Sequence, residues 1–363
     1  MFGKRSPRRI FSRHRQKARI PWVWILLGAV ILLIFFLVPT YDQPMVSVDQ
    51  VTPFLANYTP PPSPSPTPRP TPEHGGRIVF TCTRGDFNQL CIINADGTGL
   101  QQLSADAGAN DYYPVFNPDG KALMFASNRN GAFDIYLMIF GQRELFQITS
   151  NVGNILSPDF SPDGRQIVFT NQAGETPSAI WMVNTDGLDP HLFYAGPGDI
   201  VAVAWSPDGR TLAYAMETDL AGQYQVYLMD VDGTGQRPLT AGMQGVGGSL
   251  SWSPDSQSLL IYAGPVGGRD IFRIDVATGG ATQLTNGGNN ASPCYSPDGT
   301  QIVFNSLRNN GQADLYIMNT DGSGQRQLTD NPEPDWQPRW GRSSESKNQR
   351  FCESAKQEWL SHF

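Results

Sequence analysis

A tetrapeptide of the pattern Ser-Pro-Asp-Gly returns along the chain at a nearly constant interval, and this repeat limits the possible folds more than any other feature. Successive aspartates of the repeat are separated by 44, 45, 47 and 43 residues. A fixed period in this range is typical of chains built from repeated supersecondary units. The copies lie at 117–120, 161–164, 206–209, 253–256 and 296–299, with Asn117 in place of Ser and Ser256 in place of Gly.

Each copy predicts a tight turn between two antiparallel strands. Pro presets the first central residue of a type I turn, Asp suits the next position, and Gly takes the positive φ that follows. An apolar or aromatic segment such as 201–205 precedes the turn, and a short β-rich run such as 212–214 follows it. A third strand, an Asp-Gly turn and a fourth strand ending in Leu-Thr or Ile-Thr complete the unit. Four short strands in each unit, with no apolar period of 3.6, indicate a propeller blade.

The two ends of the repeat array predict how the blades close into a ring. The first unit begins directly at its second strand, 78–80, and lacks a first strand. The last unit is followed by a further first-strand segment at 335–340, which matches 111–116 position for position. We predict that this C-terminal strand completes the N-terminal blade, which gives six blades and protects the sheet edges.

The composite repeat resembles that of TolB-type six-bladed propellers. It reads aromatic-Ser-Pro-Asp-Gly, then Ile-Val-Phe-x-Ser-x-Arg, then Asp-Leu-Tyr-Ile-Met-Asn-x-Asp-Gly-Ser-Gly-x-x-x-Gln-Leu-Thr, and the copy at 296–329 follows it most closely. The resemblance covers about residues 75–340. It implies an all-β, six-bladed β-propeller of four-stranded antiparallel blades. It also implies recognition of a protein or peptide partner in the cell envelope, although this fold hosts unrelated activities.

The N-terminal segment predicts a membrane anchor. Residues 1–19 carry eight basic and no acidic side chains, and an apolar run of seventeen residues follows at 22–38. This length is at the short end of the range for a spanning helix, and the basic flank places that side in the cytoplasm. We predict a cytoplasmic arm at 1–19 and a single transmembrane helix at 20–39. A cleaved signal peptide is the alternative, which the long apolar core and the lack of a small-x-small site disfavour.

The remaining boundaries follow from composition. Residues 59–72 contain eight prolines in fourteen positions, which predicts an extended polyproline stalk within a linker at 40–74. The propeller is expected at 75–340, on the extracytoplasmic face of the membrane. A C-terminal tail at 341–363 is compatible with either a short amphipathic helix or disorder.

Charge and motif content exclude several classes of function. The chain has 26 basic and 33 acidic residues, so removing the eight basic residues of the arm leaves 18 against 33, a net charge of −15. Such an acidic domain is not expected to bind nucleic acid. Four scattered histidines and the lack of metalloprotease, serine-hydrolase and P-loop motifs predict a non-enzymatic protein without metal or cofactor.

Two cysteines are placed for a disulfide. Cys82 ends the second strand of the first unit and Cys91 lies in its third strand, so the two could face each other across a hairpin. A bridge there suits an oxidising compartment, and two small buried hydrophobic residues are the alternative. Cys294 occupies a first-strand position and is expected in the core.

Three polar residues near the start of the first strands are candidates for a ligand site in the central funnel. Asp111, Asn290 and Asp335 align at the end of the strand that usually faces the channel of a propeller. Two carboxylates and an amide could bind a cation, an amine or a peptide terminus. The alternative is that they solvate the channel mouth or cap turns.

Three arginines, Arg84, Arg129 and Arg308, recur after the second strands, and we expect them to pair with acidic neighbours such as Asp134 and Asp314 in preference to a ligand. The features together predict a membrane-tethered propeller that serves as a non-enzymatic protein-binding or peptide-binding scaffold in the cell envelope. The alternative is an envelope sensor or carbohydrate-binding propeller that uses the central funnel.

Overall fold

The computed structural model describes residues 76–342 except 143, 175, 221 and 310. The predicted arm, transmembrane helix and linker, together with the tail beyond Arg342, lie outside the described residues. Within the described part, no helix has the length and apolar character needed to cross a bilayer.

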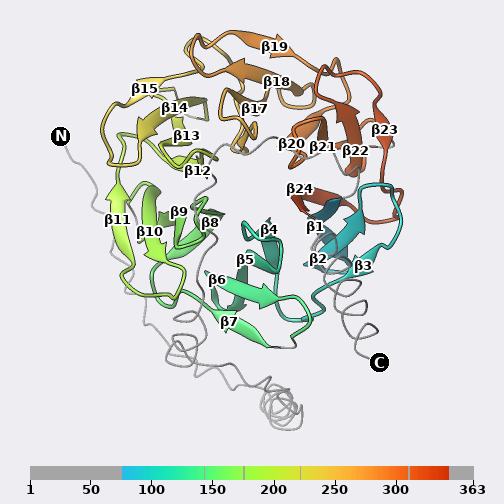
Figure 1. The fold of residues 1–363 in the computed structure, drawn as a ribbon, viewed down its shortest axis with the longest axis horizontal. Helices are drawn as coiled ribbons and strands as arrows, with labels where there is room; N and C mark the ends of the chain where they lie inside the picture. Colours follow the sequence, from blue (N-terminus) through green and yellow to red (C-terminus); the bar gives the residue numbers. More distant parts are fainter. Residues whose placement is uncertain (1–75, 143, 175, 221, 310, 343–363) are drawn as a thin grey trace, which may run out of the picture. The chain divides into compact units, whose positions relative to one another are not determined.

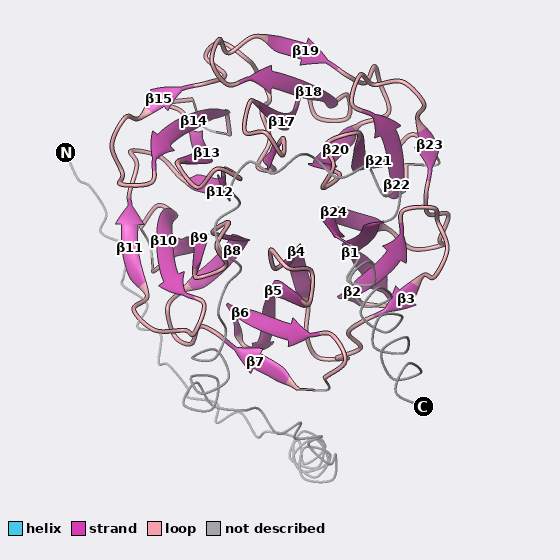
Figure 2. Ribbon diagram, in the orientation of Figure 1, coloured by secondary structure: helices cyan, strands magenta, loops and turns pink. Residues whose placement is uncertain are grey.

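The described chain forms six four-stranded antiparallel sheets around a central axis (Figures 1 and 2). This arrangement confirms the predicted six-bladed propeller with four-stranded blades. The strands are, for blade 1, β24 (Asp335–Arg342), β1 (Gly76–Arg84), β2 (Phe87–Asn94) and β3 (Gln101–Gln102); for blade 2, β4 (Asp111–Phe116), β5 (Ala122–Asn130), β6 (Ala132–Ile139) and β7 (Leu145–Gln147); for blade 3, β8 (Asn154–Phe160), β9 (Gln166–Gln172), β10 (Ala179–Asn184) and β11 (His191–Tyr194); for blade 4, β12 (Ile200–Trp205), β13 (Thr211–Glu217), β14 (Tyr224–Asp230) and β15 (Arg237–Pro238); for blade 5, β16 (Ser251–Trp252), β17 (Ser258–Ala263), β18 (Asp270–Asp275) and β19 (Ala281–Gln283); for blade 6, β20 (Asn290–Tyr295), β21 (Gln301–Ser306), β22 (Asp314–Asn319) and β23 (Arg326–Gln327).

Blade 1 is built from both ends of the described chain, as predicted. β24 pairs antiparallel with β1, and the register places Trp340 opposite Ile78 and Asp335 opposite Cys82. In Figure 1 the red strand β24 lies beside the blue strand β1. The ring is therefore closed by backbone hydrogen bonds between segments at opposite ends of the sequence.

The repeated tetrapeptide forms the predicted turn between the first and second strands. In the copy at 161–164, the Gly164 N–H donates to the Ser161 carbonyl at 2.8 Å, and the Ser161 hydroxyl donates to the Asp163 carboxylate at 2.7 Å. Gly164 has a φ of 71°, in the left-handed region that glycine enters without steric cost. At the one copy that lacks this glycine, Ser256 adopts a φ of 60°.

A second recurring cluster attaches the short outer strand to the rest of the blade. In blade 2, the Asp134 carboxylate accepts hydrogen bonds from the Thr149 hydroxyl at 3.0 Å and the Gln147 amide at 3.3 Å. The Thr149 oxygen in turn accepts the Ile135 N–H at 2.9 Å. Blade 5 repeats the cluster with Asp270, Gln283 and Thr285. The cluster gives a physical reason for the recurring Asp of the third strand and the Gln-x-Thr of the fourth.

The core lies between adjacent blades. One cluster joins Ile78 and Phe80 of blade 1 to Val303 and Ile317 of blade 6. Cys294 is buried in the same cluster, as expected for a core residue. Apolar burial of this kind stabilises a fold by about 25 cal/mol for each Å² removed from water, so each blade depends on its neighbours for its hydrophobic stabilisation.

Cys82 and Cys91 form a disulfide with a Cα–Cα distance of 5.8 Å. In the ladder between β1 and β2, Cys82 lies opposite Gln89, and Cys91 lies opposite Phe80. The bridge therefore runs diagonally across the hairpin.

Candidate binding site in the central channel

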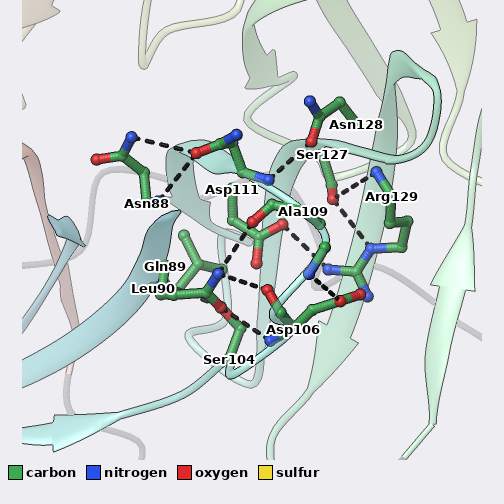
Figure 3. Close-up of polar contacts among 12 residues, drawn as sticks. Asn88, Gln89, Leu90, Ser104, Asp106, Ala109, Asp111, Ser127, Asn128 and Arg129 are labelled. Carbon is green, nitrogen blue, oxygen red and sulfur yellow. Dashed lines mark hydrogen bonds and ion pairs between the residues drawn. The ribbon is translucent and has the colours of Figure 1, made fainter. Parts of the chain in front are cut away.

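The three funnel candidates are buried in the structure and are held by side chains near them. Asp111, Asn290 and Asp335 are each 0% exposed. Arg129 Nη2 lies 3.0 Å from Asp111 Oδ1, which is visible in Figure 3. Arg308 Nη2 donates to Asn290 Oδ1 at 3.0 Å in the equivalent position of blade 6.

Arg129 pairs with an acidic neighbour as predicted, but this neighbour is Asp111; Arg308 binds an amide, so the prediction of an acidic partner is wrong for Arg308. The two arginines bind the residues that start the first strand of their own blade, Asp111 and Asn290, and not Asp134 or Asp314. Asp134 and Asp314 instead accept hydrogen bonds from residues in or just after the outer strand of their own blade, from Gln147 and Thr149 in blade 2 and from Gln327 in blade 6.

Arg84 follows the same pattern at a longer distance. It lies 4.0 Å from Asp335 Oδ1 and 3.8 Å from Glu333 Oε2. Burial raises the pKa of Asp335 to about 6, against the opposing effects of hydrogen bonds and of the Arg84 charge.

The side chain of Asn290 joins two neighbouring blades. The Asn290 amide of blade 6 donates to Asp270 Oδ1 at 3.2 Å and to Thr285 Oγ1 at 3.0 Å, both in blade 5. Within the described range, no hydrogen bond or ion pair links any two of Asp111, Asn290 and Asp335. The Asn290 side chain therefore has a structural role between blades, and the site for a cation, an amine or a peptide terminus at Asp111, Asn290 and Asp335 stays a prediction.

The central channel contains a different polar cavity, of about 110 Å³. Side chains from five of the six blades line it, so it lies where the innermost strands converge. Its lining residues are Tyr113, Ser157, Gly248, Ser249, Tyr262, Ser292, Gln337 and Arg339.

Four of the lining residues occupy the same unusual backbone position. Tyr113, Ser157, Ser292 and Gln337 have φ values of 54°, 49°, 50° and 52°. Each directly precedes a proline, and the four lie two residues after Asp111, Ile155, Asn290 and Asp335. Left-handed backbone at a residue other than glycine costs on the order of 1–3 kcal/mol and is concentrated at functional sites.

These residues lie at β-bulges. In blade 6, Ser292 and Pro293 together oppose the single residue Phe304, because the register shifts between Ala291 and Cys294. Blades 1, 2 and 3 show the same shift, with an x-Pro pair opposite Phe80, Phe125 and Phe169. A bulge redirects a side chain, and a proline there loses no hydrogen bond on the free side of an edge strand. The bulges explain why the residue that lines the cavity lies two positions beyond the one that sequence alignment suggested.

Blade 5 contributes Tyr262 from its second strand, β17, and not from a bulge in its first strand. A Cβ atom on Gly247 would lie 1.8 Å from Tyr262 Cε2, so only glycine leaves room for this ring. The Arg269 guanidinium lies 5.3 Å from the centre of the same ring, in a cation–π contact. Gly247 and Arg269 together hold Tyr262 at the cavity.

The cavity contains one basic side chain and several hydroxyl groups. Arg339 is half-buried and makes no hydrogen bond or ion pair with any other described residue. Gln337 is already engaged, because its Oε1 accepts the Thr81 hydroxyl and the Tyr113 N–H, both at 3.1 Å. Burial raises the pKa of the Tyr113 phenol, so this group stays protonated and able to donate.

A buried carboxylate that does not line the cavity interacts electrostatically with Arg339. Asp159 accepts N–H bonds from Phe160 at 3.0 Å and Trp205 at 2.9 Å. Burial raises the pKa of Asp159 to about 6, and the charge of Arg339 is one of the effects that opposes this rise. Among the residues described, no group of three or more His, Cys, Asp or Glu side chains is arranged to hold a metal ion.

Sequence reasoning missed this cavity, although a signal was present. An x-Pro pair occurs in the first strands of blades 1, 2, 3 and 6, at 337–338, 113–114, 157–158 and 292–293. Proline is rare inside paired strands, so its recurrence indicates a shared bulge.

Comparison with known proteins agrees with the fold. The family model of the TolB beta propeller domain matches residues 62–177 and 172–356. An uncharacterised protein of Agrobacterium fabrum is 30% identical over 195 residues, which are 50% of this chain and 60% of that protein. A TolB homologue of Chlorobium luteolum is 30% identical over 206 residues, which are 56% of this chain and 46% of that protein. The chain thus spans less than two thirds of either relative.

A solved structure gives the same result for the architecture. The crystal structure of TolB from Acinetobacter baumannii matches with a TM-score of 0.66 at 24% identity, over 73% of this chain and 66% of that one. At this identity the similarity concerns the fold alone. With two matches of the family model that together extend over most of the sequence, the chain belongs to the TolB beta propeller domain family.

Proposed function

We propose that this protein is a non-enzymatic binding module that takes a protein or peptide partner of the cell envelope at its central cavity. The observation that carries the proposal is the cavity lining. Five blades contribute residues to it, and four of the lining residues have a left-handed backbone conformation. Four strands each place a residue with an energetically unfavourable backbone conformation at this cavity. This concentration of strain favours a binding role for those four residues.

The chemistry of the lining favours binding over catalysis. Among its eight residues are serine and tyrosine hydroxyls, one amide and one guanidinium, and none is His, Cys, Asp or Glu. A serine nucleophile requires an adjacent general base, which this lining does not supply. The TolB homologue among the relatives supports an envelope partner by analogy of family.

The size of the cavity favours a side chain or a chain end as the inserted group. A volume of about 110 Å³ accommodates a few non-hydrogen atoms and not a folded segment. The rest of a peptide or protein partner would lie on the loops around the channel mouth.

The location that we propose is the extracytoplasmic face of the cell membrane, with the N-terminus in the cytoplasm. The basic arm and the apolar run at 22–38 support this orientation. The disulfide between Cys82 and Cys91 supports it independently, because such bonds persist in oxidising compartments.

Site-specific photo-crosslinking of the full-length chain in living bacteria tests the function. A photo-reactive phenylalanine analogue replaces Tyr113 at the cavity, and in a matched control it replaces Thr282, which is exposed on β19 at the outer edge of blade 5. We expect a discrete crosslinked protein from position 113 and none from position 282. Equal crosslinking from both positions, or none from position 113, would contradict the proposal.

Membrane fractionation tests the location. The full-length chain is expected in the membrane fraction, and a variant without residues 1–39 in the soluble fraction. A full-length chain that is soluble would contradict the proposed tether.

A further inference from the structure

The cavity has hydrogen-bond donors that no protein group uses. The hydroxyls of Ser157, Ser249 and Ser292 line it, and none of them makes a hydrogen bond to another residue within the described range. Arg339 adds the N–H groups of a guanidinium, also without a protein acceptor there. Ser157 and Ser249 are only 6% and 8% exposed, so the protein shields most of each residue from solvent.

The unpaired groups in the cavity all favour a negatively charged ligand. A guanidinium only donates hydrogen bonds and is permanently positive, while hydroxyls can donate to an anion. No carboxylate is among the lining residues, and Asp159, whose pKa the Arg339 charge influences, accepts backbone N–H bonds at both of its oxygens. The cavity is therefore complementary to a negatively charged acceptor.

We propose that the central cavity binds a carboxylate of a peptide partner, an Asp or Glu side chain or a C-terminus, through Arg339 and the serine hydroxyls. This inference rests on the proposed peptide-binding function and specifies its chemistry. The planar fork of a guanidinium matches the two oxygens of a carboxylate, which allows two parallel hydrogen bonds.

A carboxylate suits the rest of the molecule better than a more highly charged anion. The chain beyond residue 19 carries a net charge of −15, which opposes the approach of polyanions. A single carboxylate needs only the local charge of Arg339, and a volume of about 110 Å³ accommodates the end of one acidic side chain. This ligand is opposite in charge to the cation or amine predicted for Asp111, Asn290 and Asp335, and it binds at different residues.

The test uses the full-length chain in detergent and two probes. The first probe is a display library of short random linear peptides with free C-termini. The second is sodium acetate, compared with sodium chloride at equal ionic strength in thermal unfolding. The variants are Arg339→Gln, which removes the charge, and Arg339→Lys, which keeps the charge but loses the fork. Arg342→Gln is the matched control, because this exposed arginine lies on the same strand outside the cavity.

We expect the wild type and Arg342→Gln to select peptides that share an acidic residue or require a free C-terminus. Arg339→Gln should bind those peptides about 10-fold to 100-fold more weakly, since hydrogen bonds to charged groups have this magnitude. Arg339→Lys should fall between the two. Acetate should raise the unfolding temperature of the wild type and of Arg342→Gln but not of Arg339→Gln.

The remaining outcomes separate this inference from the proposed function. Peptides without a shared carboxylate that bind Arg339→Gln equally well would overturn the carboxylate site and leave peptide binding intact. Acetate stabilisation that depends on Arg339, with no peptide selected, would support the carboxylate site and contradict the peptide function. Neutral glycans that compete with the selected peptides and bind Arg339→Gln normally would overturn the inference in favour of carbohydrate recognition.

Discussion

The Arg129 guanidinium lies 3.0 Å from the Asp111 carboxylate, whose side chain has no exposed surface. The second carboxylate oxygen of Asp111 has no hydrogen-bond partner among the described residues. In blade 6 the same two positions hold Arg308 and Asn290, with the same separation of 3.0 Å. The protein thus contains an ionic and a neutral form of one inter-strand contact.

This internal pair predicts unequal losses of stability when either side of the contact is changed. Arg129→Met leaves a buried carboxylate without a cation, and we expect a loss of about 3–5 kcal/mol in the free energy of unfolding. Asp111→Asn reproduces the contact of blade 6 and should cost about 1 kcal/mol or less. Chemical denaturation measures both, and equal losses would contradict the comparison.

Ring closure predicts the effect of removing β24. A chain that ends before Pro334 leaves the edge of β1 unpaired and exposes Ile78 and Phe80, so we expect it to aggregate. A chain that ends at Arg342 keeps β24 and should remain monodisperse. Size-exclusion chromatography with light scattering distinguishes the two, and a soluble, equally stable shorter chain would show that closure is dispensable.

The left-handed bulges predict a trade-off between stability and binding. Ser292→Gly relieves the positive φ and should raise the free energy of unfolding by about 1 kcal/mol, while Ser292→Ala keeps the strained backbone and gains nothing. Both variants remove the hydroxyl, so each should bind acidic peptides about five-fold more weakly than the wild type. Parallel denaturation and peptide titration test this, and a Ser292→Gly variant that is no more stable than Ser292→Ala would argue against strain at this position.

The buried carboxyl of Asp335 predicts a dependence of stability on pH. Burial raises the pKa of Asp335 to about 6 in the folded chain, above its ordinary value in an unfolded one. The folded state therefore binds the proton more tightly, and its stability rises as the pH falls through 6 and becomes constant below about 4. From pH 7 to pH 5 the wild type should gain about 1 kcal/mol relative to Asp335→Asn. A difference between the two proteins that does not change with pH would refute this assignment.

Much of the fold could be predicted because its determinants are local and repeated. The Ser-Pro-Asp-Gly turn closes on its own side chains, as in the hydrogen bond from Ser161 to Asp163, so four residues are enough to specify it. The match between 335–340 and 111–116 predicted closure because an unpaired strand and an incomplete blade require each other.

The site was harder to predict because its geometry depends on the partner strand. Asp111 and Tyr113 are two residues apart and would share a face in a regular strand. The bulge at Tyr113 redirects its side chain into the cavity, while Asp111 stays buried against Arg129. The cavity also combines residues from five blades, such as Ser157 and Arg339, whose proximity no local pattern contains.

The position of β1 between β2 and β24 has a mechanical consequence. A tension applied to the chain ahead of Gly76 acts along β1, which is held by a ladder of hydrogen bonds on each side. Such a force would load both ladders in shear at once, and a strand at the margin of the sheet would have only one. A propeller suspended from its N-terminal end would therefore be attached through a strand that is well suited to resist extraction.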